Sequence, residues 1–342
     1  MKYISRAPLR IGLAGGGTDV APYCDIYSGA VLNATIDLFA TVVLIPRDDN
    51  KVIFYDLNAE VKFEFEAKEK LEDNPEINLQ IGVYNRIVKD YSNKALPCEI
   101  IFAIDAPTGS GLGTSSTLVI ALIGAFVEWL KLPLGEYDIA HLGVSIERED
   151  LQFVGGKQDQ YAATFGGFNF MEFHKKNRII VNPLRIKPSV IKELEFHLLL
   201  FYTQINRESA RIIEVQKANV ERQEKDAIEA THQLKDLAYK MKEAILKDEL
   251  FKIGEVLKSA WGNKKLLATG ISNRMIEDIY ETAIKAGASG GKISGAGGGG
   301  FMIFYCPGNS RFNVIKALKA KGITQQKYTF HPTGLDTWTS QQ

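Results

Sequence analysis

Residues 107–116 form a glycine-spaced segment that is well suited to binding phosphate. They read PTGSGLGTSS and lead directly into an apolar stretch with helical spacing. Glycines let the backbone approach an anion closely, and the first turn of a helix offers unpaired N–H groups and the positive end of its dipole. The sequence therefore predicts a phosphate-binding loop made of Pro107, Gly109, Ser110, Gly111, Leu112, Gly113, Thr114, Ser115 and Ser116.

Two common phosphate-binding signatures do not fit the chain. A Walker loop needs four residues between its first glycine and a Gly-Lys-Ser/Thr triplet, but three residues separate Gly287 from Gly291-Lys292, and Ile293 follows. The dinucleotide fingerprint needs a third glycine where Thr114 stands. The loop therefore belongs to another class.

Two further glycine clusters accompany this loop. Residues 8–19 read PLRIGLAGGGTD, and residues 290–300 read GGKISGAGGGG before the strand-like FMIFY. In this order, the three segments resemble the three motifs of the GHMP kinases, the superfamily of galactokinase, homoserine kinase, mevalonate kinase and phosphomevalonate kinase. The resemblance spans residues 8–305. It implies phosphoryl transfer from ATP to an alcohol with the help of Mg²⁺.

The resemblance also implies an α+β fold of two domains, a ribosomal-protein-like N-terminal domain and a ferredoxin-like C-terminal domain with added helices. Apolar patterning predicts strands at 30–46, 51–65, 99–104, 167–173, 196–202 and 326–330. It predicts helices at 78–91, 114–130, 136–149, 272–286 and 310–321, and a helical region at 208–267 broken near Gly254 and Gly262. We expect domains at 1–180 and 181–342, with the glycine loops meeting at the cleft between them.

The resemblance assigns the catalytic roles to Asp159 and Arg10. Asp159 lies in the segment GGKQDQ and would accept or orient the proton of the acceptor hydroxyl. Arg10, in the first glycine cluster, would stand beside it and keep the carboxylate ionised. The alternative for each residue is an ordinary salt bridge in a turn.

For Mg²⁺, a hard cation that prefers oxygen ligands, the resemblance points to Ser115 and Glu147. Glu147 lies in the charged segment IERED, so a solvated helix end is the alternative. Glu149 or Asp150 could also be mistaken for it.

On the substrate side, Gly16, Gly17, Thr18 and Asp19 resemble the sugar-kinase form of the first motif. The acidic residue of that form accepts hydrogen bonds from sugar hydroxyls; alternatively, Asp19 caps a helix that begins near Val20. Gly297 and Gly298 of the third cluster are expected beside the triphosphate and the sugar.

Residues 202–211 resemble a segment of the bacterial heptose-phosphate kinases of this superfamily. If the acceptor carries a phosphate, Arg207 would bind it, together with Lys157 or Arg211; an exposed arginine at a helix start is the alternative. The resemblance thus implies phosphorylation of the anomeric hydroxyl of D-glycero-D-manno-heptose 7-phosphate, toward nucleotide-activated heptose. A fucokinase-like or galactokinase-like 1-kinase of an unphosphorylated sugar is the alternative.

The composition narrows the partners. The chain has 342 residues, of which 45% are hydrophobic, and its 41 basic and 41 acidic residues balance. No global field therefore favours nucleic acid or an anionic membrane. The N-terminus lacks the apolar core of a signal peptide, no run reaches the roughly 18 apolar residues of a membrane span, and the three cysteines have no metal-ligand spacing. We expect a cytoplasmic monomer or homodimer that binds a sugar or sugar phosphate.

Two alternatives belong to other functional classes. The likeness of the N-terminal domain to ribosomal proteins suggests an RNA-binding module, but zero net charge weighs against it. A degenerate kinase that senses sugars is disfavoured because Asp159 and Ser115 are both present.

Overall fold

The first half of the chain is built on an eight-stranded sheet. The computed structural model describes residues 1–205 and 209–341. Strands follow the order β12-β1-β2-β5-β3-β4, and β6 and β7 extend the sheet from β2. Their bounds are β1 (Lys2–Ala14), β2 (Gly29–Pro46), β3 (Lys51–Asp56), β4 (Val61–Glu66), β5 (Cys98–Ile104), β6 (Phe168–Phe173), β7 (Ile179–Pro183) and β12 (Asp336–Ser340).

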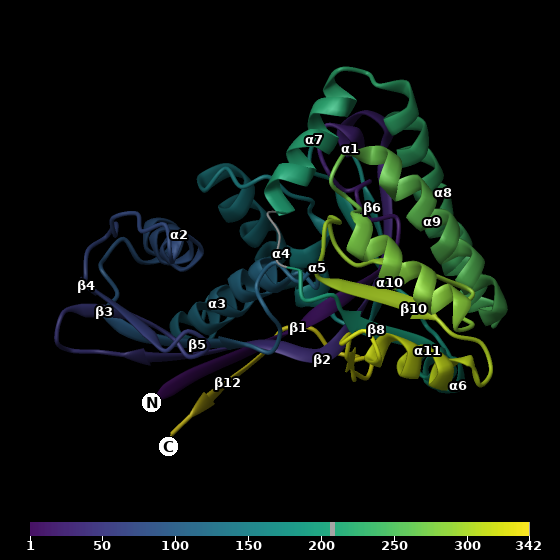
Figure 1. Ribbon diagram of the computed structural model, residues 1–342. Coiled ribbons are helices and arrows are strands. Elements are labelled where there is room, and N and C mark those ends of the chain that lie inside the picture. The colour runs from purple at the N-terminus through teal and green to yellow at the C-terminus, as the bar shows by residue number, and fades with distance from the viewer. Residues whose placement is uncertain (206–208, 342) are drawn as a thin grey trace.

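The long strand β2 divides this sheet into two regions. Residues 40–46 of β2 pair with β5, whereas residues 29–34 pair with β6. The β3–β5 pair is parallel, and the other pairs of these strands are antiparallel. The β5 region supports the phosphate loop, and the β6 region lies beside the second half of the chain (Figure 1).

Five helices accompany the first sheet, and α3 is the central one. Its apolar residues pack on β1 and β2 and toward α2 in one hydrophobic core. The bounds are α1 (Tyr23–Tyr27), α2 (Asn78–Ile87), α3 (Thr114–Leu130), α4 (Glu136–Ser145) and α5 (Gln158–Phe165). Wide helical turns at Val88–Ser92 and Ile146–Asp150 extend α2 and α4.

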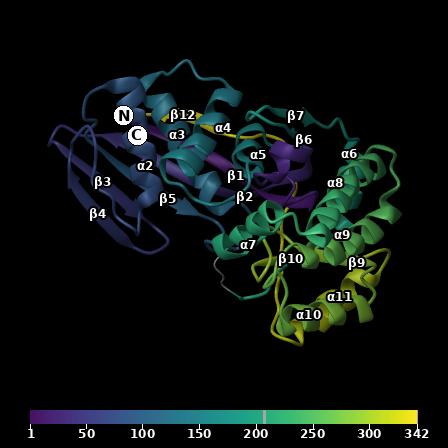
Figure 2. The same ribbon diagram turned by 90° about the horizontal axis from the view of Figure 1, so that it is seen from above.

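The second half carries an antiparallel sheet in the order β11-β8-β10-β9. Its strands are β8 (Leu198–Tyr202), β9 (Gly290–Ile293), β10 (Phe301–Tyr305) and β11 (Gln325–Gln326). The helices are α6 (Pro188–His197), α7 (Ser209–Glu221), α8 (Lys225–Leu246), α9 (Ile253–Leu267), α10 (Arg274–Lys285) and α11 (Ser310–Lys319), with a short helical turn at Leu250–Lys252. Figure 2 shows α8 and α9 side by side between the two sheets.

One hydrophobic core joins the two halves. It includes Leu9 and Ile11 of β1, Phe170 of β6, Leu237 of α8 and Trp261 of α9. The predicted α+β class is confirmed by these two sheets and their helices. Within the described residues, no helix combines the length and apolarity needed to cross a bilayer.

The end of the chain returns to the first sheet. Strand β12 pairs antiparallel with β1, from Lys2 opposite Ser340 to Arg6 opposite Asp336, so the two termini lie together (Figure 1). Phe330 also forms a bridge with Ile36 of β2. The division into 1–180 and 181–342 stays a prediction, and an N-terminal domain would have to include β12 as well.

The helical region predicted at 208–267 is broken twice, and one of these breaks is where the sequence predicts it. Residues 222–224 separate α7 from α8, and residues 247–252 separate α8 from α9. Gly254 is the second residue of α9, so the break predicted near it is confirmed by the interruption at 247–252. Gly262 lies inside α9, so the break predicted near it is wrong, and the break at 222–224 was not predicted.

Candidate active site

The phosphate loop lies between β5 and α3, the strand-turn-helix arrangement that the sequence predicts. Gly113 precedes α3 with a φ of 79°, a left-handed conformation that favours glycine. In the described part of the chain, no side chain caps α3, so the N–H groups of its first turn remain available to an anion.

The loop borders an open cavity of about 500 Å³, which we call the outer groove. Its wall contains residues from all three glycine motifs and from the segment 147–159. The loop contributes Gly109, Gly111, Gly113, Thr114, Ser115 and Ser116, and other lining residues include Arg10, Glu147, Arg148, Gly156, Asp159, Gly295 and Ala296.

Backbone hydrogen bonds at Ser110 and Leu112 anchor the loop to the first and third glycine motifs. Ser110 is buried, and its carbonyl accepts a hydrogen bond of 2.9 Å from the N–H of Phe301. A Cβ at Gly300 would lie 2.1 Å from that carbonyl oxygen, so the third motif needs glycine for this close approach. The carbonyl of Leu112 accepts a bond of 3.1 Å from the N–H of Arg10. Pro107 lies in a separate surface cavity beside Thr108.

Arg10 and Asp159 form an ion pair at the end of the outer groove. Nε of Arg10 donates to Oδ1 of Asp159 at 2.6 Å, and a terminal guanidinium nitrogen of Arg10 donates to the carbonyl of Gly111 at 2.6 Å. Ser294 donates to the same carbonyl at 2.9 Å. One guanidinium thus connects the aspartate on α5 to the phosphate loop.

Glu147 belongs to a buried polar cluster beneath the groove. Its Oε2 accepts from Ser116 at 3.1 Å, and its Oε1 accepts from Gln160 at 2.7 Å. Arg148 lies 3.4 Å from the same carboxylate. Burial raises the pKa of Glu147, and the Arg148 charge opposes this shift. Ser115 lines the groove, whereas Ser116 is the hydroxyl that contacts Glu147.

Asp19 is buried at the N-terminus of α5. Its carboxylate accepts from the N–H groups of Gly17 at 3.2 Å, Lys157 at 2.9 Å and Gln158 at 3.1 Å, and from the side chain of Gln158 at 3.1 Å. The alternative that Asp19 caps a helix beginning near Val20 is not found, because α1 begins at Tyr23. Asp19 instead caps the start of α5. This contact fixes the first motif to the helix that carries Asp159.

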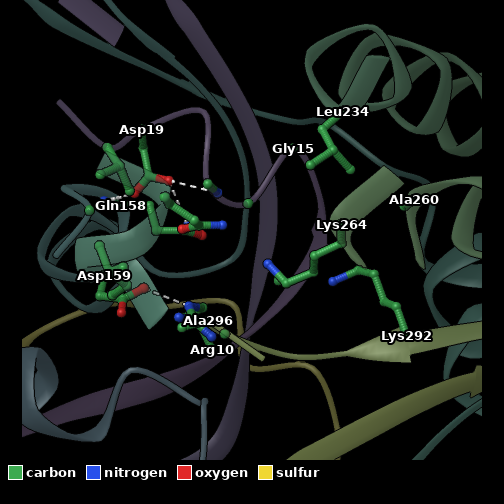
Figure 3. A pocket seen from close by; sticks show the side chains of 18 residues that line it. Arg10, Gly15, Asp19, Gln158, Asp159, Leu234, Ala260, Lys264, Lys292 and Ala296 are labelled. Atoms are coloured by element: carbon green, nitrogen blue, oxygen red, sulfur yellow. Dashed lines mark hydrogen bonds and ion pairs between the residues drawn. The ribbon is translucent and has the colours of Figure 1, made fainter. Parts of the chain in front are cut away.

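A second, smaller cavity of about 80 Å³ lies behind the Arg10–Asp159 pair, and we call it the inner cavity. Gly16, Gly17 and Asp19 border it, as do two lysines that the sequence analysis did not select, Lys264 of α9 and Lys292 of β9. Figure 3 shows both lysine side chains pointing into this space, opposite Gln158 and Asp159.

Four described residues that were predicted to bind substrate lie outside the two cavity walls, namely Lys157, Thr18, Gly297 and Gly298. Nζ of Lys157 lies 2.6 Å from Oδ1 of Asn177, on the far side of the α5 start. Thr18 is buried and bonds both backbone groups of Ala30. Gly298 donates to the carbonyl of Ile271 at 2.7 Å, next to Gly297, and it is Gly295 and Ala296 that line both cavities.

The predicted phosphate ligand Arg207 lies outside the described residues. Arg211, the other arginine of that segment, is exposed in the first turns of α7. Gln160, which holds Glu147, was missed by the sequence analysis, although it directly follows Asp159.

In this arrangement, the first turn of α3 lies beside an arginine-paired aspartate and a buried glutamate. The chain that carries it belongs to the GHMP kinases. The family's N-terminal domain model matches residues 78–167, and its C-terminal model matches residues 241–324. These matches agree with the two-domain α+β fold.

Particular relatives are more informative. D-glycero-alpha-D-manno-heptose 7-phosphate kinase of Campylobacter jejuni is 48% identical over 98% of both chains. A solved structure titled as a D-glycero-D-manno-heptose 1-phosphate kinase, from Bacteroides thetaiotaomicron, has a TM-score of 0.85 at 38% identity and covers 99% of this chain and 100% of its own. A putative sugar kinase of Campylobacter jejuni has a TM-score of 0.81 at 46% identity and covers 98% of each chain.

The unphosphorylated-sugar kinases are more distant. The Bacteroides fragilis L-fucokinase/L-fucose-1-P guanylyltransferase is 25% identical over 87% of this chain and 34% of its own length. Lactococcus lactis galactokinase has a TM-score of 0.80 at 19% identity over 98% of this chain and 95% of its own. The second likeness concerns the fold alone.

Proposed function

We propose that this protein is an ATP-dependent kinase that phosphorylates the anomeric hydroxyl of D-glycero-D-manno-heptose 7-phosphate to give the 1,7-bisphosphate. The Arg10–Asp159 pair between the two cavities is the observation that carries the proposal. A carboxylate at this position would be within reach of both a nucleotide in the outer groove and an acceptor in the inner cavity. The 48% identity to a heptose 7-phosphate kinase supports the choice of sugar.

The outer groove would take the triphosphate of ATP. The amides of residues 109–116 and the start of α3 would hold its oxygens. The γ-phosphate would then lie near Asp159, because Gly113 and Asp159 are close neighbours: a Cβ at Gly113 would lie 3.2 Å from Cγ of Asp159.

Ser115 and Glu147 would hold Mg²⁺ in this proposal. The groove offers hydroxyl and carboxylate oxygens there, and hard cations prefer such ligands. When bound, Mg²⁺ offsets the charge of the phosphates. Gln160 and Ser116 orient the carboxylate of Glu147 from within the protein.

Asp159 would orient the acceptor hydroxyl and receive its proton. Arg10 holds the carboxylate of Asp159 in place through Oδ1. Among the described residues, Oδ2 accepts no hydrogen bond, so this oxygen is available to the acceptor. Gly16, Gly17 and Asp19 would border the sugar, with Asp19 acting mainly as the anchor of α5.

The proposal is tested by measuring ADP release with a panel of acceptors. Heptose 7-phosphate should be turned over with a kcat/KM well above those of the unphosphorylated heptose, mannose, fucose and galactose. Phosphorus NMR of the product should show one new anomeric phosphate. Turnover confined to neutral sugars would favour the fucokinase-like or galactokinase-like alternative, and turnover of heptose 1-phosphate instead of the 7-phosphate would contradict the assigned hydroxyl.

A further inference from the structure

Two lysines meet in the inner cavity from different elements. Lys264 belongs to α9 and Lys292 to β9, which pack against each other. Their exposed fractions are 4% and 6%, although lysine is rarely this buried. Figure 3 shows the ammonium groups directed into the same space as Arg10. The cavity therefore gathers three cationic side chains.

The environment of Lys292 does not compensate its charge. Within residues 1–205 and 209–341, its hydrogen-bond acceptor is the carbonyl of Ile293 at 3.4 Å, and no carboxylate lies within ion-pair distance of it. Burial lowers the pKa of Lys292 well below its usual value, and the charges of Lys264 and Arg10 lower it further. A buried lysine without a carboxylate partner is costly. A bound anion would remove this cost.

The anion is not the nucleotide of the proposed reaction. Lys264 and Lys292 border the inner cavity but not the outer groove, and the Arg10–Asp159 pair stands between these spaces. The phosphate loop already provides the amides that a triphosphate needs. An anion beside the two lysines would therefore lie on the acceptor's side of Asp159.

The space is large enough to admit an anionic group. A volume of about 80 Å³ holds several water molecules, at roughly 10–15 Å³ for each. This leaves room for a phosphate group beside the two lysines. The carbon chain of the sugar would run from that group to Asp159, which borders both spaces.

We infer that Lys264 and Lys292 form a subsite for the phosphate monoester that the acceptor already carries. This inference rests on the proposed function and identifies the part of the site that selects a phosphorylated sugar. It replaces the expected role of Lys157, whose ammonium group contacts Asn177 instead. A dianion between two ammonium groups gains charge-assisted hydrogen bonds in a space that excludes most water.

The test compares Lys292→Met with wild type on phosphorylated and unphosphorylated heptose at saturating ATP. The variant should lose about ten- to a hundredfold in kcat/KM for heptose 7-phosphate, mainly through KM, because a charged hydrogen bond is lost. Its kcat/KM for the unphosphorylated heptose should stay at the wild-type value. Lys264→Met should behave in the same way.

The matched control is Lys258→Met, which changes an exposed lysine of the same helix, α9, outside both cavities. It should leave both acceptors unaffected. Lys292→Met removes a buried charge, so its melting temperature should equal or exceed that of wild type. An equal fall in kcat for both acceptors would place Lys292 at the transferred phosphoryl group and contradict the subsite. An unchanged ratio of kcat/KM between the phosphorylated and the unphosphorylated heptose would also contradict it.

A binding measurement separates this inference from the proposed function. Calorimetry with inorganic phosphate, in the presence of saturating ADP to fill the outer groove, needs no turnover. Binding to wild type and Lys258→Met but not to Lys292→Met supports the subsite even if neither heptose is phosphorylated. Equal binding to all three proteins, or none to wild type, contradicts it.

Discussion

Arg10 and Asp159, 149 positions apart in the sequence, are joined by a 2.6 Å hydrogen bond. The guanidinium is buried, whereas a quarter of the Asp159 side chain is exposed. The pair therefore has a sheltered cation on one side and a carboxylate facing ligand space on the other. It forms the common wall of the outer groove and the inner cavity. A proton acceptor for a sugar hydroxyl needs this position between donor and acceptor.

Replacing Asp159 by asparagine should lower turnover without unfolding the protein. The amide keeps the shape and an oxygen for Arg10 but cannot take a proton, so we expect kcat to fall by about 10²- to 10⁴-fold. The measurement is ADP release at saturating ATP and sugar, with circular dichroism as the check on folding. Asp73→Asn, at an exposed aspartate of the loop before α2, is the control. Full turnover in Asp159→Asn would exclude this mechanism.

Replacing Glu147 by glutamine should raise the Mg²⁺ concentration needed for half-maximal rate by about ten- to a hundredfold. The glutamine can still pair with Gln160 and Ser116, but it lacks the charge that a divalent cation prefers. Rates are measured across a Mg²⁺ titration at saturating sugar. Glu149→Gln serves as the control, because Glu149 bonds Ser145 and lies outside the groove wall. A shift in Glu149→Gln alone would move the proposed metal ligand to that residue.

The phosphate loop and α3 could be predicted because their signals are local. The helix predicted at 114–130 is found at Thr114–Leu130. Its apolar spacing and the glycines before it need no information from distant parts of the chain. Tertiary contacts then gather the three glycine motifs, whose order the family resemblance supplies.

The helix ends within residues 208–267 could be predicted only in part, because the glycines there do not mark all of them. A Cβ at Gly254 would lie 1.9 Å from Oγ of Ser289, so this glycine permits close contact between α9 and the strand beside it. The actual breaks contain Gln223 and Asp248, both with left-handed φ angles near 60°. Neither residue type signals a helix end strongly.

The lysines of the inner cavity carry no sequence signal of their own. Lys264 has an exposed lysine, Lys265, as its neighbour in a charged helix, and Lys292 sits inside a glycine motif. Only the packing of α9 on β9 buries both. Strand β12 was missed for a similar reason, since its partner β1 is at the other end of the chain.

Two glycine-to-alanine changes should have opposite effects on stability. Gly113→Ala forces a side chain into a left-handed conformation, 3.2 Å from Cγ of Asp159, and should cost about 1–2 kcal/mol and reduce kcat. Gly262→Ala lies in α9 with no atom within 4 Å of the new Cβ, and should stabilise the protein by about 0.5–1 kcal/mol. Denaturant unfolding measures both effects. Equal effects of the two changes would contradict the role assigned to Gly113.

His331 should make the protein less stable in mild acid. It lies between β11 and β12, where its backbone N–H donates to the carbonyl of Thr35 at 2.9 Å and its ring contacts the ring of Phe39. Burial lowers its pKa, and the charge of Arg6 lowers it further. Below the ordinary pKa of about 6.5, the unfolded chain binds this proton more readily than the folded one, so stability falls as the pH drops.

His331→Gln removes that proton-binding difference. The fall in melting temperature between about pH 7.5 and about pH 5.5 should therefore be smaller in the variant than in wild type, by about one degree or more. Other titrating groups are common to both proteins, so the difference isolates His331. His141→Gln, at an exposed histidine of α4, is the matched control. If His331→Gln and wild type lose stability in parallel, His331 titrates alike in both states, and its burial against Phe39 has no effect on proton binding.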